Sequence, residues 1–167
     1  MPHIWPTLLA AAAALVFIPA TGHAFEECTP FTVMVASEGR QIEIVDHGAE
    51  GVSPGDQRIG VARLMTEDGD DVGEIHWVAT VVQPHEDGSS RLISDGVLRL
   101  PTGDVMYRML PEATFRDPDV TPLSAAPVEA TRLITGGTGV FAGATGDLAW
   151  ERQDNDDLTF TMNVTCD

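Results

Sequence analysis

The sequence predicts an all-β fold, an eight-stranded antiparallel barrel with up-and-down connectivity. Turn-forming residues recur every ten to fifteen residues, and helical periodicity is nearly absent from the chain. The turns are short, as at Glu67–Asp70 and Pro101–Gly103, so each strand is expected to pair with the next one. Eight antiparallel strands can close into a barrel whose interior just holds one small ligand.

The expected strands are the runs of β-branched and aromatic residues between these turns. The first strand is expected in two parts, Phe31–Ala36 and its continuation Gln41–Val45. The others are expected at Gln57–Met65, Val72–Gln83, Arg91–Leu100, Asp104–Met109, Glu129–Thr135, Gly146–Arg152 and Leu158–Thr165. Two longer segments, Asp46–Asp56 and Pro111–Pro127, interrupt the meander. Loops of this length are usually functional, and the second is the expected mouth of the barrel.

The N-terminal segment predicts export from the cytoplasm. Leu8–Ala20 is almost unbroken apolar sequence, and the small residues that a signal peptidase reads end at Ala24. The alternative is a membrane anchor, but about 13 apolar residues are too few for a span, which takes about 20. We therefore expect a signal peptide at residues 1–24, a barrel domain at residues 25–167, no stable membrane insertion, and a secreted or periplasmic location.

Two cysteines lie near opposite ends of the expected mature chain. An oxidising compartment favours a disulfide between Cys28 and Cys166. The first and last strands of a closed barrel are neighbours, so this bridge would fasten the seam. A metal site is disfavoured, because neither cysteine has a nearby CxxC or HxxxH partner.

The charge balance excludes two classes of partner. The chain has 26 acidic and 9 basic residues, all of the latter Arg, and a net charge of −17. Nucleic acid and anionic membrane surfaces both require a cationic patch, so neither is expected to bind.

A glycine-rich loop follows the expected strand that ends at Thr135. Its glycines are Gly136, Gly137, Gly139, Gly143 and Gly146. A phosphate-binding loop must open a helix, whereas a second strand follows here, which argues against a nucleotide site. Glycine instead permits positive φ and close backbone approach where a sheet bends sharply. Phe141 is expected to plug the apolar interior beneath the loop.

The segment ITGGTG, followed by Val140-Phe141-Ala142-Gly143 and Gly146, closely resembles the signature loop of the allene oxide cyclase and dirigent protein superfamily. The resemblance is specific over about 20 residues, and the spacing of the strands is similar outside them. It implies an eight-stranded barrel with an apolar, cofactor-free pocket. It also implies association into homotrimers.

Strand alternation and the resemblance together nominate pocket residues. In Val72–Gln83, Trp77 and Ala79 share a face, and alignment with the family places that face in the pocket. Glu74 and His76 then point outward, where a surface or subunit-interface role is favoured over metal or acid–base chemistry.

Two further strands leave alternatives open. Asp95 and Arg99 share one face of Arg91–Leu100. If that face is inward they form a candidate buried pair, and if it is outward they are solvated charges of little energetic weight. Tyr107 shares a face with Val105 and Met109, which fits either core packing or a catalytic hydroxyl.

Dirigent pockets carry an acid just after the strand that corresponds to Gly103–Leu110, and Glu112 occupies that place here. They also carry a later Arg, for which this chain offers Arg116 or Arg132. The dirigent Tyr on the third strand is replaced by Ala79. The acid and amide that allene oxide cyclases place on the first strand are missing from Phe31–Ala36. Neither family activity therefore transfers directly.

Two functions remain open, and fold alone does not decide between them. The protein is either an exported, cofactor-independent isomerase or cyclase, or a non-catalytic barrel that binds an apolar small molecule. In the first case Glu112 transfers a proton, with Asp95 and Arg116 as further catalytic candidates. The residues expected to bind the ligand are Trp77, Ala79, Arg99, Tyr107, Arg132 and Phe141. No metal or cofactor is expected.

Overall fold

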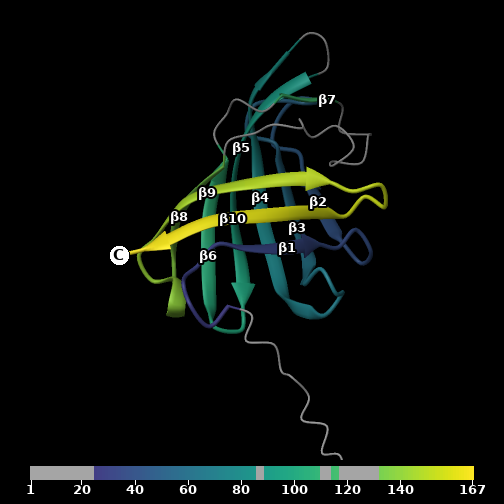
Figure 1. Cartoon of the computed structure of the whole chain (residues 1–167). Helices are drawn as coiled ribbons and strands as arrows, with labels where there is room; N and C mark the ends of the chain where they lie inside the picture. The colour runs from purple at the N-terminus through teal and green to yellow at the C-terminus, as the bar shows by residue number, and fades with distance from the viewer. Residues whose placement is uncertain (1–24, 86–88, 110–113, 117–131) are drawn as a thin grey trace, which may run out of the picture.

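The computed structural model describes residues 25–85, 89–109, 114–116 and 132–167. They form an all-β structure with a closed eight-stranded antiparallel barrel (Figure 1). The strands are β1 Phe31–Val35, β2 Gln41–Val45, β3 Gln57–Met65, β4 Asp71–Pro84, β5 Ser89–Leu100, β6 Gly103–Met109, β7 Thr114–Arg116, β8 Arg132–Gly137, β9 Ala144–Arg152 and β10 Leu158–Cys166. Helix within the described chain is limited to one 3₁₀ turn, η1, at Gly139–Phe141.

The strands pair in the order β1-β10-β9-β8-β6-β5-β4-β3, and a pairing of β1 with β3 closes the ring. The predicted up-and-down barrel is therefore confirmed. The predicted two-part first strand is also confirmed, because β1 and β2 lie end to end along β3. The short strand β7, which pairs with the beginning of β5, was not predicted.

The glycine loop is shorter than predicted. β8 continues through Gly137 and η1 follows at once, so β9 begins at Ala144 instead of Gly146. Gly136 and Gly139 have φ of 154° and 61°, conformations that L side chains rarely adopt. A Cβ atom at Gly139 would collide with the carbonyl oxygen of Thr102. The expected positive φ values and close backbone approach are both present.

The half of the barrel beneath this loop is filled by apolar side chains. Phe141 is fully buried there, with its ring centroid 5.5 Å from that of Phe31. Across the barrel interior as a whole, the other large side chains that are almost completely buried are Leu64, Ile75, Leu98, Met162, Val33, Val35, Val105 and Val164. The predicted disulfide is confirmed, since Cys28 and Cys166 are bonded at this end with a Cα–Cα distance of 6.1 Å.

Two buried aspartates, Asp157 and Asp56, order the end of the barrel opposite the disulfide. Asp157 accepts hydrogen bonds from the backbone N–H of Ser37 at 2.6 Å and from Asn155 Nδ2 at 2.8 Å. Arg40 Nη2 donates to the carbonyl oxygen of Asp156 at 3.3 Å. These contacts join the β1–β2 corner to the β9–β10 turn. Burial alone would raise the pKa of Asp157, but the Ser37 and Asn155 hydrogen bonds and the Arg40 charge outweigh it and lower that pKa.

Asp56 organises the predicted long loop at Asp46–Asp56. Its carboxylate accepts hydrogen bonds from the backbone N–H groups of His47 and Ser53, at 3.0 and 2.7 Å. The backbone of this loop also bonds Val81 of β4 in both directions, at 2.9 Å. The loop is therefore ordered against the barrel wall.

Two segments that carry predictions fall outside the described residues. They are the expected signal peptide at residues 1–24 and most of the Pro111–Pro127 connection. Among the residues that are described, none forms a helix with the length and apolarity that a bilayer crossing requires.

Candidate functional site: a cavity inside the barrel

A cavity of about 80 Å³ occupies the barrel interior on the side away from the disulfide. One buried water needs about 10–15 Å³ on a comparable scale, so the space is several waters in size. Met109, the last described residue before the Pro111–Pro127 connection, and Arg132, the first described residue after it, both line the cavity. The full lining set is Val35, Arg40, Arg58, Ile75, Trp77, Ala79, Leu92, Ser94, Tyr107, Met109, Arg132, Trp150, Leu158 and Phe160.

Two glycines within strands set the positions of two aromatic rings. Gly60 and Gly96 flank Trp77 in register, and Gly96 in turn pairs with Tyr107. A Cβ atom on Gly60 would collide with the Trp77 indole, and one on Gly96 would collide with the Tyr107 phenol ring. Both rings therefore lie against the sheet over bare backbone, which is a recognised role of glycine inside strands.

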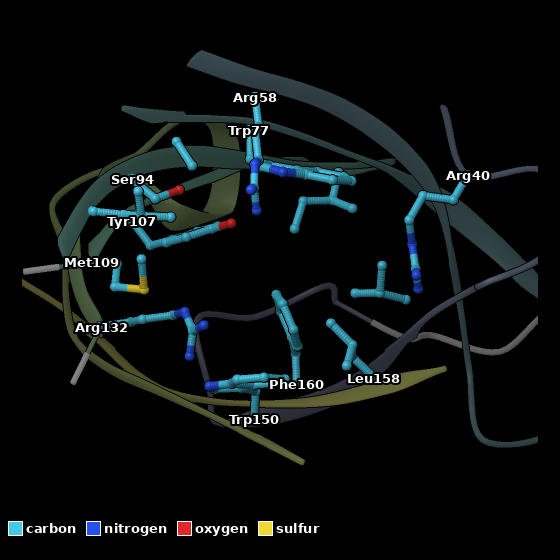
Figure 2. Close-up of a pocket in the computed structure, with 14 residues that line it drawn as sticks. Arg40, Arg58, Trp77, Ser94, Tyr107, Met109, Arg132, Trp150, Leu158 and Phe160 are labelled. Carbon is cyan, nitrogen blue, oxygen red and sulfur yellow. The ribbon is translucent and has the colours of Figure 1, made fainter. Parts of the chain in front are cut away.

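Tyr107 supplies a hydroxyl to the cavity. Its side chain is buried and carries its hydroxyl toward the middle of the space, as Figure 2 shows. Burial raises the pKa of Tyr107 to about 12. The group is therefore neutral at pH 7, where it can both donate and accept a hydrogen bond.

Arg132 supplies a buried positive charge. The residue is 8% exposed, and its guanidinium carbon lies 4.6 Å from the centre of the Trp150 ring. Figure 2 shows the two side chains together on one side of the cavity. Burial lowers the pKa of Arg132 to about 10, against an opposing effect of Tyr107, so the guanidinium remains charged at neutral pH. Arg132 Nη1 and Trp150 Nε1 are buried without a hydrogen-bond partner among the described residues.

Two more arginines line the same space. Arg58 points into it from β3, and Arg40 lies on the side opposite Tyr107 and Arg132 (Figure 2). Burial lowers the pKa of Arg40, although Asp157 and Asp156 act in the other direction. The described lining includes no Asp or Glu. Three of the nine basic residues of a strongly anionic chain thus face one cavity.

The structure places four of the predicted ligand-binding residues on the cavity wall, namely Trp77, Ala79, Tyr107 and Arg132. The prediction that Phe141 binds the ligand is wrong, because Phe141 packs in the core beneath the glycine loop and is absent from the cavity wall. It fills the interior as predicted, but in the half that is already full.

The alternative that Asp95 and Arg99 form a buried pair inside the barrel is also wrong. Both lie on the outer face of β5, where Asp95 Oδ1 accepts a hydrogen bond from Arg108 Nε at 2.7 Å. The small and apolar residues of β5 turn inward instead, since burying the charged face would leave unpaired charges in the interior. Neither residue reaches the cavity.

Glu74 and His76 point outward, as predicted, and their side chains are 3.1 Å apart at the closest atoms. Glu112 lies outside the described residues. The backbone of Arg116, in β7, pairs with that of Ser89, in β5. The Arg116 side chain lies outside the described set.

Sequence reasoning missed several wall residues, of which Trp150 and Phe160 are the largest. A signal for them exists, because Trp150 alternates with the buried Leu148 on β9 and Phe160 with the buried Leu158 and Met162 on β10. Among the described residues, no group of three or more His, Cys, Asp or Glu side chains could hold a metal ion.

Two solved structures share this fold. One is described as pyocyanin demethylase; it is 22% identical, with a TM-score of 0.63, and the match covers 82% of this chain and 100% of that one. The other is described as a nonspecific heme-binding cyclase that catalyzes a cycloaddition during neoabyssomicin biosynthesis. It is 14% identical, with a TM-score of 0.50 over 83% of this chain and 64% of that one.

No protein-family model matches the sequence, and no curated protein does. At these levels of identity the two structures share the fold alone with this chain. Both proteins act on small molecules by their descriptions and have barrel-like folds. Membership of the allene oxide cyclase and dirigent superfamily stays a prediction.

Proposed function

We propose that this protein binds a small organic molecule inside its barrel. The observation that carries the proposal is the lining of the cavity, which combines aromatic faces with a few inward polar groups. Ligand sites are typically concave and largely apolar, with a small number of placed polar groups that orient the ligand. Trp77, Tyr107, Trp150 and Phe160 supply the aromatic faces, and Arg132 and the Tyr107 hydroxyl supply polar groups.

The proposed place of action is outside the cytoplasm, in the periplasm or the extracellular space. The apolar N-terminal segment supports export, and a disulfide between Cys28 and Cys166 would persist only in an oxidising compartment. Association as a homotrimer is proposed from the family resemblance alone.

Cofactor-independent isomerisation or cyclisation is the second candidate function. The Tyr107 hydroxyl favours it, because a neutral phenol held within a cavity can give a proton to a bound molecule or orient it. Glu112, which follows β6 by three residues in sequence, is the other proposed acid or base. If the cavity binds the ligand without transferring a proton to or from it, the protein is a binding module.

One experiment on the protein purified from its native compartment distinguishes the two functions. Small molecules released on denaturation are identified by mass spectrometry, and each is then returned to ligand-free protein. Trp77 and Trp150 are the two tryptophans beyond residue 24, and both line the cavity, so tryptophan fluorescence reports its occupation.

A retained compound that changes this fluorescence supports the binding proposal, and its conversion on incubation supports an enzyme. The Gly96→Val variant is the control, because its side chain would push the Tyr107 ring into the cavity and abolish the change. If no compound is retained and no added compound changes the fluorescence, the proposal is wrong.

A further inference from the structure

We propose that the ligand is a planar aromatic anion whose acid group binds Arg132 Nη1 and Trp150 Nε1. The inference rests on the proposed function, since it assumes that the cavity is occupied. It goes further by naming the chemical class of the occupant and the two atoms that recognise it.

The hydrogen-bonding capacity of the wall points to an acceptor. Arg132 Nη1 and Trp150 Nε1 are buried, and neither has a partner among the described residues. Buried polar groups are nearly always satisfied in folded proteins. Guanidinium and indole N–H groups can only donate, so the missing partner must accept. The two side chains stack at 4.6 Å, which allows one acid group to receive hydrogen bonds from both.

The charge of the wall points to an anion. Arg132 remains protonated at neutral pH, and the described lining contributes no carboxylate to balance it. The Trp150 ring offsets the charge only in part. The field of this buried guanidinium enters the cavity, whose low-dielectric walls focus it. Water could accept the two hydrogen bonds but would leave the buried charge uncompensated.

The shape of the wall points to a flat, aromatic body. The Trp77 and Tyr107 rings lie against the sheet because Gly60 and Gly96 lack side chains. Phe160 meets Tyr107 edge to face, with 6.4 Å between ring centroids. Aromatic groups favour stacked or edge-to-face contact with other rings. A planar ring carrying an acid group fits both this wall and the donor pair.

Three probes of similar size separate charge from shape. Benzoate and benzamide have nearly the same shape and differ in charge, while cyclohexanecarboxylate carries the charge without a planar ring. Their affinities for residues 25–167, produced with the disulfide formed, are measured by calorimetry at pH 7 and fixed ionic strength. We expect benzoate to bind at least tenfold more tightly than either of the others, and to alter tryptophan fluorescence.

Two variants test the donor pair. Arg132→Met removes the charge and keeps most of the length, so benzoate affinity should fall at least tenfold while benzamide affinity stays the same. Trp150→Phe keeps a ring and removes the N–H group, so benzoate affinity should fall severalfold. Arg108→Met is the matched control, because it removes the same charge from the outer face and should leave the preference unchanged.

Circular dichroism establishes that each variant folds. If Arg132→Met does not fold, Arg132→Lys replaces it and should retain the charge preference with weaker binding. Equal affinities for benzoate and benzamide, or a benzoate preference that survives Arg132→Met, would overturn the inference while cavity binding stood. Equal binding of cyclohexanecarboxylate and benzoate would overturn the aromatic part. Failure of all three probes overturns this ligand class, and the proposed function falls only if the native protein also retains no compound.

Discussion

The phenol ring of Tyr107 lies directly on the backbone of Gly96, its register partner in the neighbouring strand. The same relationship recurs two strands away, where the Trp77 indole covers Gly60. These four residues form one row across β3, β4, β5 and β6. Two missing side chains therefore set how far two aromatic rings stand from the middle of the cavity.

Gly96→Ala should close part of the cavity. The added methyl group would collide with the Tyr107 ring and force it toward the centre, and overpacking of this kind costs about 1–3 kcal/mol. We expect a loss of that size in urea denaturation and at least tenfold weaker ligand binding. In a double-mutant cycle, Tyr107→Ala should recover much of the loss. Additive effects of the two substitutions would show that the ring and the glycine do not interact.

Arg132→Met should stabilise the ligand-free protein at neutral pH. Burial lowers the pKa of Arg132 to about 10 in the folded state, so the folded protein holds this proton less tightly than the unfolded chain. The charged form thus opposes folding below pH 10. The free energy of unfolding rises as the pH increases from the folded-state pKa of about 10 toward the higher pKa of the unfolded chain. Replacing the buried charge with an apolar group should raise the unfolding free energy by on the order of 1 kcal/mol. The difference between variant and wild type should narrow above pH 10. A less stable variant at pH 7 would mean that stacking on Trp150 outweighs desolvation.

Removal of the disulfide should weaken the barrel substantially. The bridge closes a loop of 138 residues between Cys28 and Cys166. The chain-entropy model assigns about 5 kcal/mol to a loop of this length, with typical measurements of about 2–5. We expect a loss in that range for the Cys28→Ser/Cys166→Ser double variant in denaturant. Intact-mass measurement before and after reduction checks the bridge itself, and two free thiols in protein from its native compartment would contradict it.

The glycine loop should not accept side chains. Val at Gly136, Gly137 or Gly139 should each destabilise the fold by more than the roughly 1 kcal/mol of a simple propensity change. Gly136 and Gly139 have positive φ, and a side chain at Gly137 would meet the carbonyl oxygen of Asp104. Gly69→Val is the control, because Gly69 has positive φ in open space and should show the backbone effect alone. Unchanged melting temperatures at all three loop positions would exclude the tight-turn interpretation.

Glu112→Gln should separate an enzyme from a binding module. If Glu112 is a general acid or base, the substitution should lower turnover by about 100-fold or more and leave affinity almost unchanged, because size and shape barely differ. The test compares affinity and turnover of a retained, convertible compound in the two proteins. Tyr107→Phe provides the parallel test of the other proton donor. Full activity of the Gln variant would exclude Glu112 from catalysis.

Local patterns and the family resemblance were sufficient for the described strands other than β7, for the order of those strands, and for four of the fourteen wall residues. Alternation along one strand placed Trp77 and Ala79 on the same face, because successive side chains of a strand point to opposite faces. The family resemblance placed that face inside. The same reasoning failed on β5, where both faces carry polar residues, Ser90 and Ser94 inside and Asp95 and Arg99 outside. The alternation of side chains along β5 could not by itself show which of its faces is buried.

The meeting of Arg132 with Trp150 was decided by the tertiary structure. Arg132 begins β8, Trp150 lies near the end of β9, and Arg40 comes from the corner after β1. Each shows in sequence as an isolated polar or aromatic residue, and no spacing links them. Arg132 pairs in register with Leu148, two residues before Trp150, so the pairing of β8 with β9 brings the two side chains together on one face. Closure of the barrel then brings Arg40 to the opposite side of the same interior. The register of β8 and β9 therefore decides the donor pair, whereas its burial inside a cavity exists only once the ring has closed.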